Sequence, residues 1–156
     1  RNDDEIAAGI GQWCCPTFLL AERERANSES GDKNATHTIR VTANALSELV
    51  LDQSADFGAP DLAGFSLENV ENGAQLIAVR LCPDNPLDIL LDCDMEPKGK
   101  DVRLHYACGQ AAHSEETEAA VGFPQNRGCV RDSWHAISSG GRQLHRWALP
   151  CILPVH

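Results

Sequence analysis

The chain has 156 residues, of which 42% are hydrophobic, which is enough apolar material for the core of one globular domain. Its 13 basic and 23 acidic residues give a net charge of −10. This balance excludes nucleic acid as a partner, because such binding needs clustered Lys and Arg. The sequence contains no run of about 18 apolar residues, so no membrane insertion is expected.

The first segment predicts a short helix. Acidic residues stand at its start, apolar residues follow at Ile6, Ile10 and Trp13, and Pro16 ends it. We therefore expect an N-terminal helix within residues 1–20, followed by a polar linker over 21–35. Because the chain begins with Arg1, we also expect it to be a processed product or the continuation of a longer protein, with the helix as the tail of an upstream domain.

From residue 36 the hydrophobic period changes to two, which is typical of half-buried strands. We expect strands over 36–42, 49–51, 65–70, 76–81, 87–92 and 102–107, separated by turns rich in Gly, Pro and Asn. The Asn72-Gly73 pair predicts a hairpin between the strands 65–70 and 76–81. Residues 36–156 are therefore predicted to form an antiparallel β-sandwich, jelly-roll-like, so the fold class is mainly β with a short N-terminal helix.

The C-terminal third is predicted to be a surface loop over 109–128, a turn over 138–141 and a closing edge strand over 144–155. Between them the stretch 126–135 combines apolar anchors with groups that hydrogen-bond polar ligands. We interpret it as a loop in which Arg131 and Asp132 pair, while Trp134 covers the edge of the sheet. The candidate ligand-binding residues, chosen as flat aromatic rings with neighbouring polar groups that suit saccharides, are Tyr106, Arg131, Asp132, Trp134, His135 and Trp147.

The sequence contains only partial matches to the patterns of catalytic and metal sites. Asp132 and His135 have the spacing in which an aspartate can orient a histidine base, but the chain has neither a G-x-S-x-G elbow nor a G-D-S block. No catalytic residue is therefore assigned. The spacing of His105, Cys108 and His113 matches no common ligand set, so no metal or other cofactor is expected. The seven cysteines include no C-x-x-C pair, and we interpret them mainly as small buried hydrophobes.

Several of these motifs together resemble a known family. The Gly64-Phe65 strand, the run 102–109, the Arg-Asp-Ser motif at 131–133 and the stretch 144–147 resemble the C-terminal β-domain of SGNH/GDSL-type hydrolases, which act on acylated carbohydrate. The resemblance covers residues 36–155 and departs from the family at Cys108 and in an acidic insertion over 110–125. It implies that the catalytic serine, aspartate and histidine lie upstream of Arg1.

The resulting hypothesis is a non-catalytic, carbohydrate-associated module that positions substrate for such an esterase or assembles on a phage particle or cell surface. Its expected location is extracellular or on a virion. Its expected partners are a surface polysaccharide or acylated glycan, and protein partners or further copies in a larger assembly. Two alternatives stay open: a purely structural virion component, and a small esterase that uses His135.

Overall fold

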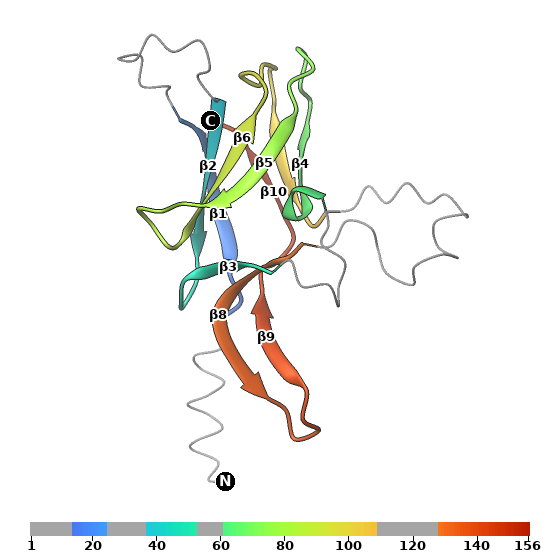
Figure 1. Cartoon of the computed structure of the whole chain (residues 1–156). Helices are drawn as coiled ribbons and strands as arrows, with labels where there is room; N and C mark the ends of the chain where they lie inside the picture. The colour runs from blue at the N-terminus through green and yellow to red at the C-terminus, as the bar shows by residue number, and fades with distance from the viewer. Residues whose placement is uncertain (1–13, 25–36, 53–60, 109–127) are drawn as a thin grey trace, which may run out of the picture.

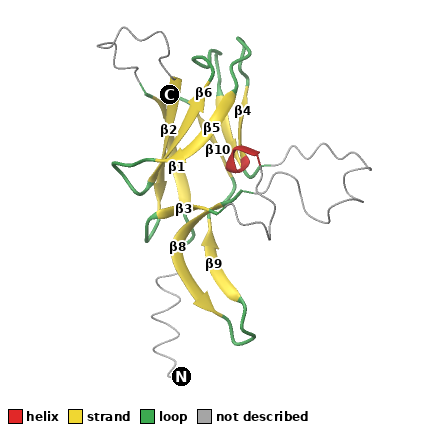
Figure 2. Ribbon diagram, viewed as in Figure 1, coloured by secondary structure: helices red, strands yellow, loops and turns green. Residues whose placement is uncertain are grey.

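The structure is a computed structural model that describes residues 14–24, 37–52, 61–108 and 128–156. In these ranges it is mainly β and antiparallel, as predicted (Figure 2). No helix in this part of the chain is long and apolar enough to cross a membrane. The strands are β1 (Thr17–Arg23), β2 (His37–Asn44), β3 (Leu49–Leu51), β4 (Phe65–Glu68), β5 (Leu76–Leu81), β6 (Asp88–Cys93), β7 (Arg103–Tyr106), β8 (Val130–Ile137), β9 (Gln143–Trp147) and β10 (Cys151–Pro154).

The strands form three sheets, with the orders β1-β2-β6-β5, β10-β7-β4 and β3-β8-β9. The first two sheets make a sandwich-like body, and they are joined along one edge by backbone bonds between β1 and the segment after β10. There the Arg23 amide donates to the His156 carbonyl at 2.8 Å, and the His156 amide donates to the Ala21 carbonyl at 2.9 Å. The β8–β9 hairpin extends away from this body, as Figure 1 shows.

The core lies between the inner faces of the two body sheets. Strand β2 contributes Ile39 and Val41 to it, and β6 contributes Ile89 and Leu91, all fully buried. This is the alternation that the two-residue period predicts, because successive side chains of a strand point to opposite faces. Each such side chain stabilises the fold by about 1.5–3 kcal/mol when it leaves water.

Three aromatic rings connect the two body sheets at one end of this core. Phe18 of β1 packs edge-on against Tyr106 of β7, with ring centroids 4.8 Å apart, and Phe65 of β4 lies 4.8 Å from Tyr106. Edge-to-face and tilted geometries are the arrangements that aromatic quadrupoles favour. The cluster therefore fixes β1 over the β10-β7-β4 sheet.

The outer face of the four-stranded sheet carries paired charges beside the buried Leu90. Arg80 of β5 donates to both oxygens of Asp92 on β6, at 2.8 and 3.1 Å, and Thr38 of β2 donates to Asp92 Oδ1 at 2.8 Å. These partners cover the carboxylate, so Asp92 is buried along with the other five residues of β6. The arginine and the hydroxyl offset the cost of removing Asp92 from water.

Several predictions about the elements are wrong in the described residues. The segment 17–23, placed with the N-terminal helix and the linker, is strand β1 of the main sheet, because its residues pair with β2 and bury Phe18 and Ala21. The closing strand is two strands, β9 and β10, which belong to different sheets and are separated at Pro150, a residue with no amide donor. The predicted helix over 3–13 and the loop over 109–127 lie outside the described residues.

A further error concerns the hairpin around Asn72 and Gly73. Strands β4 and β5 do not pair with each other, since β4 pairs with β7 and β5 with β6. The turn instead crosses from one body sheet to the other. Asn72 stabilises this crossing, because its side chain donates to the Glu96 carbonyl at 2.8 Å and accepts from the Lys98 amide at 3.1 Å.

Candidate functional site

The β8–β9 hairpin holds most of the predicted site residues. The stretch from 130 onward, expected as a loop, is a strand, and the turn Ser138–Gly141 is confirmed. The Ser138 amide donates to the Arg142 carbonyl at 2.8 Å, and Gly141 has a φ of +77°, a conformation that favours glycine. This turn sets the register of the hairpin, in which His135 lies opposite His145.

One face of the hairpin is aromatic and polar. His135 and His145 are cross-strand partners, so their side chains lie on the same face, and Trp147 follows His145 by two residues on that face. The rings of His145 and Trp147 pack edge to face, with centroids 5.8 Å apart and planes at 80°. His135 is exposed, and the other two side chains are half-buried. The rings of His135, His145 and Trp147 therefore lie on one face of the β8–β9 hairpin, which is called the arm below.

The opposite face of the hairpin carries a buried ion pair. Arg146 Nη2 lies 2.5 Å from Asp132 Oδ2, a close charge contact in which the angles fall outside hydrogen-bond geometry. Asp132 Oδ1 accepts a bond from the Trp134 amide at 3.2 Å, and the Arg146 guanidinium lies 5.2 Å from the centre of the Trp134 ring. Arg146 also donates to the Ser47 hydroxyl at 3.4 Å, which connects the hairpin to the segment before β3. This face has a structural role.

The predicted pairing of Arg131 with Asp132 is wrong. Arg131 Nε donates to Asp52 Oδ2 at 2.8 Å, while its Nη1 donates only to the backbone carbonyl of Asp132, at 3.0 Å. Neighbouring strand residues point to opposite faces, so the two side chains cannot meet. The Arg131–Asp52 pair and the Arg146–Asp132 pair together hold the base of the arm, one on each face.

Tyr106 belongs to the core and not to a ligand surface. Its side chain is 1% exposed, and its hydroxyl accepts a bond from the Val130 amide at 3.0 Å and donates to the Val130 carbonyl at 3.4 Å. Burial raises the pKa of this phenol, which stays protonated as a result. Tyr106 therefore positions the first residue of β8, and the prediction that it binds a ligand directly is corrected by its burial.

Asp132 and His135 do not form a catalytic pair. Both oxygens of Asp132 are occupied on the buried face, whereas His135 lies on the exposed face with its Nδ1 3.5 Å from the Ser133 carbonyl. An aspartate that orients a histidine base must bond to the imidazole. The two residues have the spacing of such a pair in the sequence, but their side chains lie on opposite faces of the hairpin.

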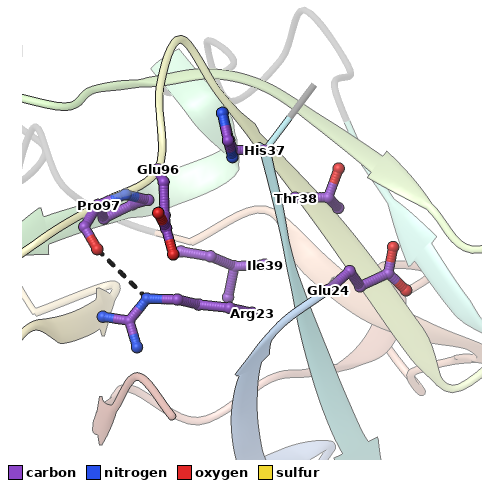
Figure 3. A pocket seen from close by; sticks show the side chains of 7 residues that line it. All are labelled: Arg23, Glu24, His37, Thr38, Ile39, Glu96 and Pro97. Carbon is purple, nitrogen blue, oxygen red and sulfur yellow. Dashed lines mark hydrogen bonds between the residues drawn. The ribbon is translucent and has the colours of Figure 1, made fainter. Parts of the chain in front are cut away.

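A second feature of the described residues is an open pocket of about 320 Å³ (Figure 3). Several of its polar groups are already paired. Arg23 donates to the carbonyls of Pro97 at 3.3 Å and Val155 at 3.1 Å, and Glu24 forms an ion pair with Arg40. Its lining residues are Arg23, Glu24, His37, Thr38, Ile39, Glu96 and Pro97. The imidazole of His37 is the one ring among these lining residues, whereas the hairpin carries two imidazoles and the Trp147 indole on one face, so the hairpin is the better candidate for a saccharide site.

The structure adds His145 and Arg142 to the residues predicted for the hairpin. Both follow from the pairing of residue 138 with residue 142, which places residue 145 opposite 135 and leaves 142 next to the turn. His145 and Trp147 thus join His135, while Tyr106 is in the core and Asp132 and Trp134 are on the structural face. Comparison of the chain with family models, with curated proteins and with solved structures gave no match.

Proposed function

We propose that this chain is a non-catalytic, carbohydrate-associated β module in which the His135, His145 and Trp147 face of the β8–β9 hairpin contacts a glycan. The observation that carries the proposal is the row of aromatic and imidazole rings on an arm that extends from the body (Figure 1). Saccharides present apolar ring faces and many hydroxyls, so they bind to flat side chains that combine stacking with hydrogen bonding.

Two further observations support this proposal. The arm is held at its base by the Arg131–Asp52 and Arg146–Asp132 pairs, so the binding face is preorganised and little entropy is lost on binding. The ring nitrogen Nδ1 of His145 is buried and has no hydrogen-bond partner among the residues that the structure describes, and a buried polar atom of this kind gains a bond when its ring turns toward a hydroxyl. Both features suit a ligand that is rich in hydroxyl groups.

The proposal places the chain beside the SGNH-type esterases that its sequence resembles, as a part that positions substrate at a cell surface or on a phage particle. An esterase reaction at His135 is not proposed, because the geometry of Asp132 does not support it.

The test is binding of surface polysaccharides and acylated oligosaccharides to the purified chain, measured on a glycan array and by calorimetry. We expect His135→Ala and Trp147→Ala to weaken binding by about tenfold each, since a stacked or hydrogen-bonded ring contributes roughly 1–1.5 kcal/mol. Ile152→Ala is the matched control, because Ile152 is 49% exposed on β10, in another sheet. Absence of binding to every glycan, or equal loss in the control, would rule the proposal out.

A second candidate is a structural component of an assembly, and the tip of the arm favours it. Ile137 is 75% exposed and Leu144 is 43% exposed on the same hairpin, next to the turn. Apolar side chains at the end of an arm are typical of protein contacts. Sedimentation at increasing concentration distinguishes the two functions: self-association that Ile137→Asp abolishes, without glycan binding, would favour the structural role.

A further inference from the structure

Two cysteines that are distant in sequence lie beside each other where β7 and β10 pair. Cys151 is the first residue of β10 and pairs with Tyr106, the last residue of β7. Cys108 follows Tyr106 by two residues, and its thiol donates to the Cys151 carbonyl at 3.2 Å. Both residues carry free thiols. The fold therefore brings together two cysteines that are 43 positions apart in the chain.

The backbone after β7 explains the position of Cys108. If β7 continued, residue 108 would pair with residue 149 by the register of the two strands. Instead Ala107 has a φ of +51°, in the left-handed region, and its amide donates to the Gly64 carbonyl at 2.9 Å. A left-handed residue turns the chain out of the extended path of a strand. Because of this turn, the Cys108 thiol lies against Cys151.

The separation of the two side chains is within the range that a disulfide can bridge. The carbonyl oxygen and the Cβ of one residue are about 3 Å apart, so the Cys108 sulfur is within about 6 Å of the Cys151 Cβ. Rotation from one χ1 well to another displaces a sulfur by about 3 Å. Rotation of the two side chains therefore covers the distance that remains before the sulfurs meet.

Both thiols are also accessible to a reagent in solution. Cys82, Cys93 and Cys129 are buried, whereas Cys108 and Cys151 are partly exposed. Burial, and then the nearby Cys108, raise the pKa of Cys151 to about 11. Cys151 therefore keeps its proton at neutral pH and is a poor first nucleophile, because the thiolate is the reactive form.

We propose that Cys108 and Cys151 are a modification site, at which a small disulfide such as oxidised glutathione converts the two thiols to an internal disulfide. The Cys108 thiolate attacks one sulfur of the oxidant, whose S–S bond breaks, so that one thiolate leaves and a mixed disulfide remains. The Cys151 thiolate then attacks the Cys108 sulfur and displaces the second half of the oxidant. Two protein thiols are oxidised, the oxidant is reduced to two thiols, and the two protons released by the protein pass to them.

The disulfide holds the arm to the body. Residue 108 precedes β8 and residue 151 follows β9, so the ring that the bond closes contains the whole hairpin. Without the bond, the base of the arm is held by noncovalent contacts, among them two ion pairs. A covalent link restricts the unfolded chain and stabilises the fold. Neither thiol belongs to the proposed glycan contact, so the bond and the glycan site are tested separately.

The experiment treats the folded full chain with oxidised glutathione at neutral pH, blocks the remaining thiols, and maps the peptides by mass spectrometry. We expect a chain lighter by two hydrogens, in which the peptides of Cys108 and Cys151 are linked. Cys108→Ser should not form the link. Cys14→Ser is the matched control and should form it, because Cys14 is also partly exposed but its thiol donates to the carbonyl of its neighbour Cys15, at 3.5 Å.

The location of the link decides between the outcomes. A link between another pair of cysteines overturns the proposal, as do glutathione adducts at both residues without a link. The folded chain should also form the link at an oxidant concentration at least about tenfold lower than the chain unfolded in urea, because the fold holds the two thiols together. Equal concentrations would show that the fold does not cause the bond, and this result needs no variant that has to fold.

Thermal unfolding gives a second readout, for the effect on the arm. The oxidised chain should melt about 5–10 °C above the reduced chain, as expected for a disulfide that closes a ring of this length. The same oxidant should leave the melting temperature of Cys151→Ser unchanged. A linked chain that melts at the temperature of the reduced chain would overturn the role of the bond in holding the arm.

Discussion

Arg146 and Asp132 form an ion pair across the β8–β9 hairpin, with Nη2 2.5 Å from Oδ2 and with side-chain exposures of 6% and 0%. Each charge is removed from water and depends on the other for compensation. Their pairing orients the hairpin, because Arg146 also contacts Ser47 and the Trp134 ring. The residues that we propose as the glycan contact, His135, His145 and Trp147, are on the other side of the same two strands.

We expect Arg146→Met to destabilise the protein by about 3–5 kcal/mol, because Asp132 is left as an uncompensated buried charge. Asp132→Leu should have a similar cost. The double variant should cost much less than the sum, since both charges are then gone. Urea unfolding of the four proteins measures the coupling, and additive losses would contradict the role of the pair.

Gly128 is a position where a larger side chain should not fit. A Cβ there would lie 2.0 Å from both the Cζ and the hydroxyl of Tyr106. Gly128→Ala should therefore destabilise the fold by about 1–3 kcal/mol, because the buried ring has to move. Gly140→Ala is the control, since the nearest atom is the Ser138 hydroxyl at 3.9 Å. Thermal unfolding that does not distinguish the two variants would disprove the packing argument.

Stability should decrease in alkali because of Cys93. Burial raises the pKa of this thiol from 9.0 to about 11, with the carboxylates of Asp94 and Asp92 adding to the effect. Between these values the unfolded chain has lost the proton that the folded chain keeps, so the free energy of unfolding decreases as pH rises from 9 to 11. Denaturant midpoints measured across this range should decrease less steeply in Cys93→Ala. An identical slope would contradict this assignment.

At acid pH the relevant group is Asp92. Arg80, and then Thr38, lower the pKa of this carboxyl below its ordinary value of 3.8. The stabilisation is present above pH 3.8 and is lost as pH falls through the folded-state pKa. Arg80→Gln should raise the pH of acid unfolding, followed by circular dichroism. Arg103→Gln, which breaks the exposed pair with Asp101, should leave it unchanged, and an equal shift would contradict the prediction.

Strand positions followed directly from the sequence where one face is buried. The alternation over 36–42 predicted β2, and the short apolar run over 49–51 predicted β3. Asn72-Gly73 failed as a hairpin signal, because the neighbouring strands find better partners in β6 and β7. Local patterns describe how a strand exposes its faces, but pairing depends on contacts between residues far apart in the chain.

The same distinction between local pattern and long-range contact applies to the candidate site. Its rings, its histidines and the excess of arginine over aspartate in 130–147 can be read from the chain. Which of them act together depends on the hairpin register and on Asp52 and Ser47, which are distant in sequence.

By itself, the sequence determined the β class, most strand positions, the acidic charge and the clustering of aromatic and basic residues near the C-terminus. These properties depend on composition and on the two-residue period of a strand. Only the tertiary structure decided that Tyr106 is a core residue, that Asp132 pairs with Arg146, and that His135, His145 and Trp147 share one exposed face. The physical reason is that the burial and the partners of a side chain depend on which strands pair. The strands pair in the arrangement that minimises the free energy of the whole fold, and a local pattern does not contain that information.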